Sequence, residues 1–157
     1  MLSGLPGSGK STWAKNKSLN DGSLIINRDS LRTMFYGYYK FDKEFEYIIK
    51  NCSQRIVQEI IDCNVKDIII DECNLTRNSR NFWLYTIDIK LNNNDRKEVK
   101  IILVWFKENK RNVEFRTKGD LRGFTPEYWD DVINNMKTVY ENPDINEGFD
   151  KIIEVTI

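Results

Sequence analysis

The sequence contains no histidine, so it lacks the side chain that most often serves as a general base near neutral pH. A Ser–His–Asp triad is therefore excluded, and any catalytic base has to be a carboxylate or another group. The three cysteines, Cys52, Cys63 and Cys73, include no Cys-x-x-Cys pair. Their number and spacing argue against both a disulfide framework and a zinc site.

Long apolar runs and a surplus of one charge are also missing. No apolar run reaches about 18 residues, so we expect no transmembrane helix. The chain starts in a glycine-rich motif, so we expect no signal peptide and a cytoplasmic location, in the host cytoplasm for a viral protein. The 24 basic and 24 acidic residues balance, which disfavours a protein that coats long nucleic acids through phosphate contacts. An enzyme that binds only the end of a nucleic acid is compatible with this net charge of zero.

The glycine-rich motif spans residues 4–11, Gly-Leu-Pro-Gly-Ser-Gly-Lys-Ser, and fits the P-loop pattern G-x-x-x-x-G-K-[ST]. Glycines let successive N–H groups point at the β- and γ-phosphates, and a following helix adds its positive end. In this pattern Lys10 bridges the transferring phosphate and the Ser11 hydroxyl holds Mg²⁺. The helix-forming stretch over 12–19 favours this interpretation over a flexible glycine loop. We therefore expect ATP and Mg²⁺ as cofactors, with the nucleotide bound by Gly4, Pro6, Gly7, Ser8, Gly9, Lys10, Ser11 and Thr12.

Short apolar runs alternate with helical patterns along the rest of the chain. The runs over residues 24–26, 68–70, 101–104 and 152–155 are typical of strands in a parallel sheet. Helices are expected from Phe45 to Ile60, from Thr76 to about Leu91, and from Pro126 until Pro143 ends it. Thr76 and Thr125 are the expected N-caps. With the P-loop, this alternation predicts an α/β fold of P-loop NTPase/kinase type: a single domain over 1–157, with three layers and helices flanking a central parallel sheet.

The strand expected before the P-loop has only residues 1–3, whereas a central strand has about five or six residues. Either this strand is very short, or the true start of the protein lies upstream.

A carboxylate follows the second apolar run, in the stretch 27–32, Asn-Arg-Asp-Ser-Leu-Arg. Ligands of open α/β sheets bind at the carboxyl ends of the strands, and Asp29 falls there. It is the natural candidate for the base that takes a proton from an acceptor hydroxyl. Arg32, one helical turn later, could bind an acceptor phosphate as a bidentate fork. The alternative is that Asp29 or Ser30 caps a helix and Arg32 is a solvated charge.

A second pair of acids, Asp71 and Glu72, follows the third apolar run. A carboxylate at this place usually holds Mg²⁺ in P-loop proteins, often through water. Because successive strand residues point opposite ways, only one of the two can face the metal, and we slightly favour Asp71. Both acids could instead cap a turn. The neighbouring Cys73 has no feature nearby that would activate its thiol.

A basic segment, defined as residues 107–124, follows the fourth apolar run. It contains six basic residues up to position 122, while Gly119 and Gly123 interrupt its helical pattern. This composition predicts a lid that closes over ATP and delivers Arg116 or Arg122 to the transferring phosphate. The alternative is an ordinary solvated helix with a loop.

Together these motifs resemble the kinase domain of bacteriophage 5′-polynucleotide kinase over nearly the whole chain. The resemblance rests on residues 6–14 (PGSGKSTWA), 27–32 (NRDSLR), 71–75 (DECNL), and the Thr125-Pro126 turn whose helix carries Met136 and Tyr140. It implies that Asp29 is the general base for a 5′-hydroxyl, that Arg32 binds the neighbouring phosphate, and that a lid arginine stabilises the transition state. Two departures concern the third motif: Cys73 replaces a threonine, and Glu72 could align with the family aspartate.

Three functions are compatible with these motifs. The resemblance implies transfer of the γ-phosphate of ATP to a 5′-hydroxyl end of DNA or RNA. A D-x-D-G-T motif is missing, so a phosphatase or ligase partner would be a separate protein. The alternatives are a P-loop kinase of a small molecule, such as a nucleoside, sugar or antibiotic, and a nucleotide-binding module without catalysis. Tyr36, Tyr38, Tyr39 and Phe41 could wall either acceptor site, or simply be core or surface aromatics.

Overall fold

The computed structural model describes residues 1–63, 65–109, 111–120 and 123–156, except 93–98. Five strands occur in these ranges: β1 (Leu2–Ser3), β2 (Leu24–Ile26), β3 (Ile68–Ile70), β4 (Ile102–Phe106) and β5 (Lys151–Val155). These strands pair in parallel, in the orders β1-β4-β5 and β2-β3. The Gly4 N–H donates to the Cys73 carbonyl at 2.9 Å, and the Asn74 amide donates to the Leu2 carbonyl at 2.8 Å. These bonds join the two groups of strands between β1 and the end of β3.

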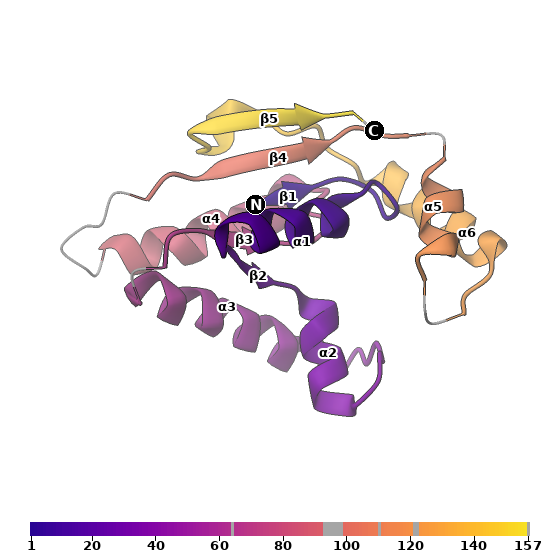
Figure 1. Cartoon of the computed structure of the whole chain (residues 1–157), viewed down its shortest axis with the longest axis horizontal. Helices are drawn as coiled ribbons and strands as arrows, with labels where there is room; N and C mark the ends of the chain where they lie inside the picture. Colours follow the sequence, from indigo (N-terminus) through magenta and orange to yellow (C-terminus); the bar gives the residue numbers. More distant parts are fainter. Residues whose placement is uncertain (64, 93–98, 110, 121–122, 157) are drawn as a thin grey trace.

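Helices cover both faces of the strands (Figure 1). They are α1 (Lys10–Asp21), α2 (Arg28–Tyr36), α3 (Glu46–Asp62), α4 (Arg77–Asn92), α5 (Asn112–Lys118) and α6 (Pro126–Thr138), and a 3₁₀ turn η1 spans Ile145–Glu147. Successive residues of β3 point to opposite faces, because Ile69 packs with Ala14 of α1 whereas Ile70 packs with Val57 of α3 and Trp83 of α4. The predicted three-layer α/β fold is confirmed.

The predicted strands and helix starts agree with the structure. Thr76 accepts a hydrogen bond from the Ser79 N–H at 3.1 Å, and Thr125 accepts one from the Tyr128 N–H at 3.3 Å, so both caps are confirmed. The first residues of two strands, Leu24 and Ile102, are more exposed than the expected buried runs. None of the described helices has the length and apolar character that a bilayer crossing requires.

The end predicted for the last helix is wrong. Helix α6 ends at Thr138, well before Pro143, and Val139 is its C-cap. The chain leaves the helix there because the next residues are bonded elsewhere: the Glu141 N–H donates to the Leu75 carbonyl at 2.9 Å, and the Tyr140 hydroxyl pairs with the Trp105 indole. Tertiary contacts, not proline, therefore set this boundary.

Candidate functional site

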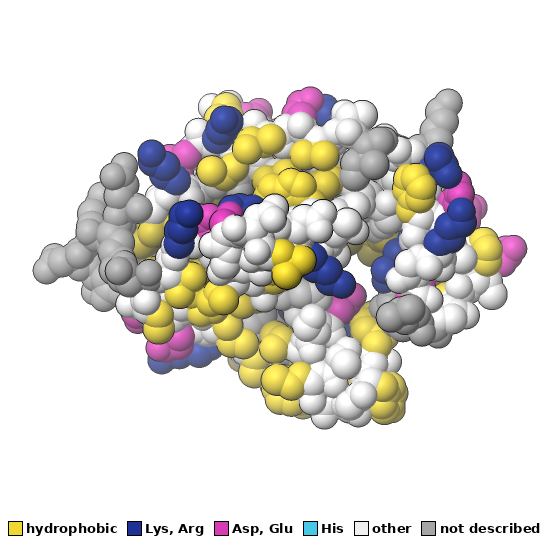
Figure 2. Space-filling model, in the orientation of Figure 1, with side chains coloured by type: hydrophobic (Ala, Val, Ile, Leu, Met, Phe, Trp, Pro, Cys, Tyr) yellow, Lys and Arg dark blue, Asp and Glu magenta, His cyan; other side chains and the backbone are white. Residues whose placement is uncertain are grey.

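One large cavity, with a volume of about 1410 Å³, collects most of the predicted site residues. It is lined by the P-loop from Pro6 to Thr12, by Asp29 and Arg32 of α2, by Asp71 and Glu72 after β3, and by Arg116 of α5. In the space-filling view a hollow separates the lobe around α2 from the lobe formed by α5 and α6 (Figure 2). The predicted Arg122 lies outside the described residues. Gly4 does not line the cavity.

Gly4 is instead required by the packing of the sheet. Its φ is +149°, and a Cβ atom there would lie 2.8 Å from the Phe106 carbonyl oxygen. Gly4 is the first residue of the P-loop motif, so its close contact with Phe106 of β4 fixes where the loop leaves the sheet.

Lys10 lies buried at the base of the P-loop, at the start of α1. Its ammonium group donates to the Leu5 carbonyl at 2.7 Å and to the Ser8 hydroxyl at 3.2 Å. These bonds hold the charge inside the curve of the loop. The adjacent Ser11 and Thr12 are exposed to the cavity.

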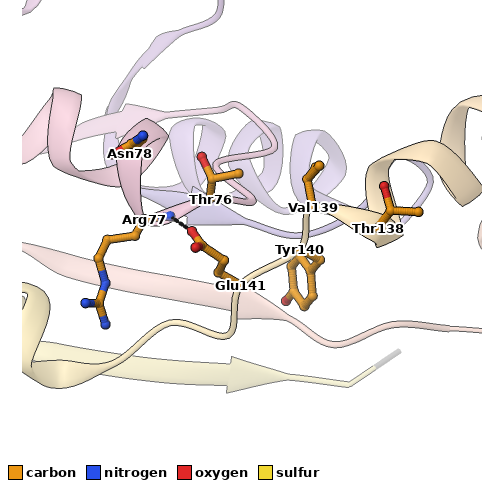
Figure 3. A pocket seen from close by; sticks show the side chains of 7 residues that line it. All are labelled: Thr76, Arg77, Asn78, Thr138, Val139, Tyr140 and Glu141. Atoms are coloured by element: carbon orange, nitrogen blue, oxygen red, sulfur yellow. Dashed lines mark hydrogen bonds between the residues drawn. The ribbon is translucent and has the colours of Figure 1, made fainter.

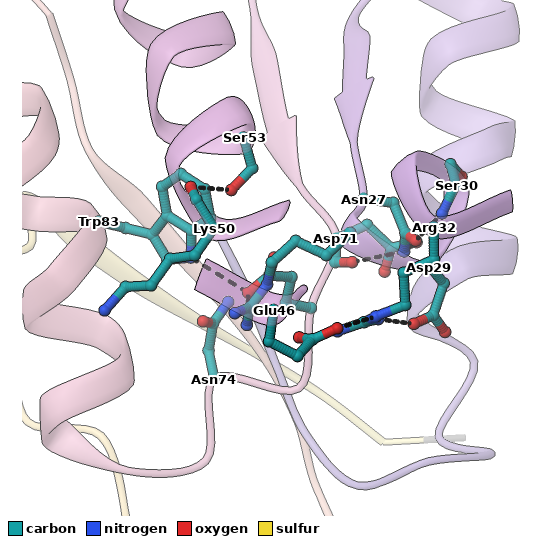
Figure 4. Close-up of polar contacts among 12 residues, drawn as sticks. Asn27, Asp29, Ser30, Arg32, Glu46, Lys50, Ser53, Asp71, Asn74 and Trp83 are labelled. Carbon is teal, nitrogen blue, oxygen red and sulfur yellow. Dashed lines mark hydrogen bonds and ion pairs between the residues drawn. The ribbon is translucent and has the colours of Figure 1, made fainter. Parts of the chain in front are cut away.

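Asp29 lies in the first turn of α2, whose N-cap is Asn27 and neither of the expected candidates, Asp29 or Ser30. The Asn27 side chain accepts a hydrogen bond from the Ser30 N–H at 3.1 Å. The Asp29 carboxylate is therefore not needed as the cap, and about half of its side chain is exposed. Its partner is Arg32, which donates to it from Nη1 (Figure 4).

Arg32 is not the solvated charge of the alternative hypothesis. It is buried, and its guanidinium forms a fork with Glu46 of α3, with Nε–Oε1 at 2.7 Å and Nη2–Oε2 at 2.6 Å. Figure 4 shows Arg32 between the two carboxylates of Asp29 and Glu46. The guanidinium carbon lies over the Phe41 ring, 5.5 Å from its centre, and Phe41 lines the cavity with Tyr39. Sequence reasoning missed Glu46, because nothing in the local pattern links positions 32 and 46.

The structure separates the two candidate metal ligands. Glu72 forms a fork with Arg28, with distances of 2.5 and 2.6 Å, and also accepts from the Trp83 indole at 3.3 Å. Asp71 is buried, and its carboxylate accepts one hydrogen bond from Asn27 at 3.3 Å. Asp71 thus makes fewer side-chain hydrogen bonds than Glu72, and its role as the metal ligand stays a prediction.

The donor set fits Mg²⁺ held through a nucleotide. The described residues hold no group of three or more His, Cys, Asp or Glu side chains that could bind a metal by themselves. Mg²⁺ usually needs only one or two protein carboxylates, because phosphate oxygens and water complete its shell. Ser11 and Asp71 line the same cavity and supply a hydroxyl and a carboxylate of this kind.

The pKa of the Cys73 thiol is affected by several charged residues of the site. Burial raises the pKa of the Cys73 thiol, while the charge of Lys10 lowers it and the charges of Asp29, Glu72 and Asp71 raise it further. The raised pKa favours the protonated thiol over the thiolate, which is the reactive nucleophile.

The basic segment contributes one side of the cavity. Arg116 lies with its guanidinium carbon 4.3 Å from the centre of the Trp129 ring of α6, and its Nη2 is 3.9 Å from Asp120. The aromatic residues Phe115, Phe124, Tyr128 and Trp129 line the cavity beside it, and Phe124 stacks on Tyr128 at 4.3 Å. Helix α5 ends at Lys118, with Gly119 as its C-cap, which agrees with the predicted interruption.

A smaller cavity of about 460 Å³ lies away from this site, between the start of α4 and the chain after α6 (Figure 3). The Arg77 backbone N–H, which would otherwise be unpaired at the helix start, donates to the Glu141 carboxylate there. None of the predicted site residues lines it.

The fold and the P-loop define a protein of the P-loop kinase class, because a central parallel sheet carries the phosphate-binding loop after its first strand. Residues 1–143 match the family model described as AAA domain, and the chain belongs to this family.

Two solved structures share the fold. The APS kinase of Mycobacterium tuberculosis, in complex with AMPPNP and APS, superimposes with a TM-score of 0.63 at 16% identity, over 98% of this chain and 85% of that chain. A gluconokinase from Sinorhizobium meliloti 1021 gives a TM-score of 0.58 at 13% identity, over 99% of this chain and 80% of that one. At these identities the similarity concerns the fold, and the resemblance to bacteriophage polynucleotide kinases stays a prediction.

Proposed function

We propose that this protein transfers the γ-phosphate of ATP to a hydroxyl group of a small organic acceptor. The observation that carries the proposal is that the P-loop, Asp29 and Asp71 line one cavity. This arrangement supplies a phosphate cradle, a base and a metal ligand at the carboxyl ends of neighbouring strands.

The residues divide the chemistry among them. Mg²⁺, held by Ser11 and Asp71 with the phosphates, would neutralise charge on the transferring group. Asp29, fixed by Arg32, accepts the hydroxyl proton as the acceptor oxygen bonds to the γ-phosphorus and the bond from phosphorus to the β–γ bridging oxygen breaks. Lys10 and Arg116 stabilise the negative charge that gathers on the phosphate oxygens.

The charge balance beside Asp29 favours a small acceptor over a polyanion. Both arginines of α2, Arg28 and Arg32, are already paired with carboxylates, namely Glu72, Glu46 and Asp29. Sites that hold nucleic-acid strands normally need uncompensated basic residues along the phosphate path. The two kinases that share the fold, named for APS and gluconate, also support a small-molecule acceptor.

A second candidate is the 5′-hydroxyl end of DNA or RNA. It is supported by the Asn27-to-Arg32 motif, and by Tyr39 and Phe41, which line the cavity on the side of Asp29 and could stack a terminal base. In that case a separate phosphatase or ligase would complete the repair of the end.

A transfer assay separates the candidates. The protein is incubated with Mg²⁺ and γ-labelled ATP and offered nucleosides, sugars, sugar acids, APS, and 5′-hydroxyl DNA and RNA oligonucleotides with 5′-phosphorylated controls. Label on a small acceptor supports the proposal. Label confined to the 5′-hydroxyl strands overturns the proposal and supports the second candidate. Bound ATP without transfer to any acceptor would leave a nucleotide-binding module as the better description.

Lys10→Ala is expected to lower phosphotransfer about 100-fold, because a charged donor to the transferring phosphate is lost. The quantity to measure is kcat/KM for ATP with the best acceptor. Lys66→Ala is the matched control, since Lys66 is exposed and does not line the cavity. Unchanged turnover in the Lys10 variant would remove the P-loop from the mechanism.

Glu46→Gln is expected to lower kcat about tenfold at unchanged KM for ATP, because the neutral amide weakens the fork that holds Arg32 against Asp29. Steady-state kinetics with ATP varied at saturating acceptor measure both constants. Glu44→Gln, on an exposed neighbour, should behave like the unmodified protein. A rise in kcat would instead indicate that Glu46 withholds Arg32 from the acceptor.

A further inference from the structure

Helix α5 rests directly on the P-loop at Gly7, and it lies beside α6 (Figure 1). A Cβ atom at Gly7 would lie 2.1 Å from the Asn112 carbonyl oxygen and 3.1 Å from the Arg116 Cβ. Asn112, the first residue of α5, is only 2% exposed. This packing fixes the base of the Arg116 side chain next to the phosphate cradle.

The head of the Arg116 side chain lies on an aromatic ring. Its guanidinium carbon is 4.3 Å from the centre of the Trp129 ring of α6, and both residues line the cavity. Its Nη2 atom is 3.9 Å from the Asp120 carboxylate, which is too far for a hydrogen bond. Its Nε atom has no hydrogen-bond partner among the residues that the structure describes. The ring therefore supports the guanidinium without engaging these two nitrogens.

Two other arginines line the cavity, and carboxylates hold them instead. Arg28 donates through two nitrogens to Glu72. Arg32 donates in the same way to Glu46. Such forks use N–H donors and compensate the positive charge. The face of an aromatic ring attracts a cation through its quadrupole and takes up none of these donors. An arginine supported by a ring, such as Arg116, therefore keeps its donors and its charge for a bound phosphate.

The Trp129 ring is itself fixed in orientation. Its indole Nε1 donates to the Asp120 carboxylate at 3.1 Å, and the Asp120 side chain is only 2% exposed. The ring also meets Phe124 and Tyr128 edge to face, with ring centres 5.9 and 5.2 Å apart. These three contacts set the plane on which the guanidinium of Arg116 rests.

We propose that Trp129 is a positioning residue, which holds the guanidinium of Arg116 beside the P-loop and leaves its N–H groups to the transferring phosphate. This inference rests on the proposed function, in which Arg116 stabilises the charge on the phosphate oxygens. A donor that is already in place needs no reorganisation when this charge develops. Asp120 acts one step further away, because it fixes the ring.

A double-mutant cycle on Arg116 and Trp129 tests this role. Arg116→Ala is expected to lower kcat about 100-fold, because a charged donor to the transition state is lost. Trp129→Leu is expected to lower kcat about tenfold at unchanged KM for ATP, because the guanidinium loses its support. When it is added to Arg116→Ala, the same substitution should cause no further loss, since no guanidinium is left to position. Steady-state kinetics with the best acceptor of the transfer assay measure both constants.

Further variants separate positioning from packing. Trp129→Phe keeps a ring face and should recover most of the activity that Trp129→Leu loses. Tyr85→Leu is the control, because Tyr85 is an exposed aromatic residue of α4 that does not line the cavity, and its kcat should not change. Melting temperatures show which variants are folded. If Trp129→Leu does not fold, Trp129→Met takes its place in the cycle.

A loss from Trp129→Leu that disappears in the Arg116→Ala background supports the proposal. Losses that multiply, or a lower melting temperature at unchanged kcat, overturn it and give Trp129 a purely structural role. Full activity of Arg116→Ala overturns it as well, because Arg116 would then have no role to position. If the unmodified protein transfers phosphate to no acceptor, the proposed function fails together with this inference. An active protein whose losses multiply defeats the inference alone, so the two failures are distinguishable.

Discussion

Replacing Asp29 by asparagine is expected to reduce phosphotransfer about 1000-fold, the range typical for removal of a general base, while the affinity for ATP stays unchanged. Asparagine keeps the size of the side chain, and its carbonyl oxygen can still accept from Arg32, but the amide cannot take a proton from the acceptor. Because Asn27 caps α2, the substitution leaves the start of the helix intact. Single-turnover transfer and calorimetric binding of an ATP analogue measure the two effects separately.

Asp88→Asn provides the control for this substitution, because Asp88 is exposed on α4 and does not line the cavity. Full activity of the Asp29 variant would defeat the base assignment. A loss of ATP affinity that matches the loss of activity would show that Asp29 maintains the structure of the nucleotide site and does not take part in proton transfer.

Arg80→Met is expected to lower the free energy of unfolding by about 3–5 kcal/mol, the usual effect of breaking a buried ion pair from one side. Arg80 is fully buried, and its guanidinium forks onto Glu147 of η1 with two distances of 2.7 Å. Its Nη1 also donates to the carbonyls of Asn74, Leu75 and Glu141 at 3.0–3.2 Å. Methionine fills part of the volume but leaves a buried carboxylate unpaired, which urea unfolding followed by fluorescence would detect.

A double variant, Arg80→Met with Glu147→Leu, checks the cause of this loss. Removing the stranded carboxylate should recover part of the stability, since an apolar pair can replace a buried ion pair. If the stability is not recovered, the loss comes from the hydrogen bonds of Arg80 to the three carbonyls and not from the ion pair.

The pH dependence gives an independent readout for Glu147. Burial alone would raise the pKa of this carboxyl, but hydrogen bonds from Arg80 and from the Asp144 N–H outweigh burial and hold the pKa below its usual 4.5. A lowered pKa in the fold stabilises the protein above about pH 4.5, and this contribution disappears as the pH falls through the lowered value. The difference in the free energy of unfolding between the unmodified protein and Arg80→Met should therefore become smaller at acidic pH.

The P-loop and the acids after the strands could be predicted from the sequence because their positions follow from local patterns. Carboxyl ends of parallel strands meet at one edge of a sheet, which brings Lys10, Asp29 and Asp71 to one cavity. Helix caps such as Thr76 are equally local, since they act on the next three residues.

The partners of the charged residues could not be predicted, because they join distant elements. Arg32 pairs with Glu46 across two helices, so the charge that sequence reasoning assigned to an acceptor phosphate is already paired. Arg28, the first residue of α2, pairs with Glu72 after β3. The burial of Asn112 likewise depends on how α5 packs on the loop, which no spacing rule describes.

The contact between Gly7 and α5 also restricts how this loop can vary. In the general P-loop pattern, position 7 is one of four free positions, so phosphate binding alone does not require glycine there. A Cβ atom at Gly7 would lie 2.1 Å from the Asn112 carbonyl oxygen of α5, so no side chain fits at this position. If all twenty amino acids were introduced at position 7, selection for a docked α5 should return glycine alone. The turnover of a Gly7→Ala variant would then show how strongly catalysis depends on the contact between α5 and the P-loop.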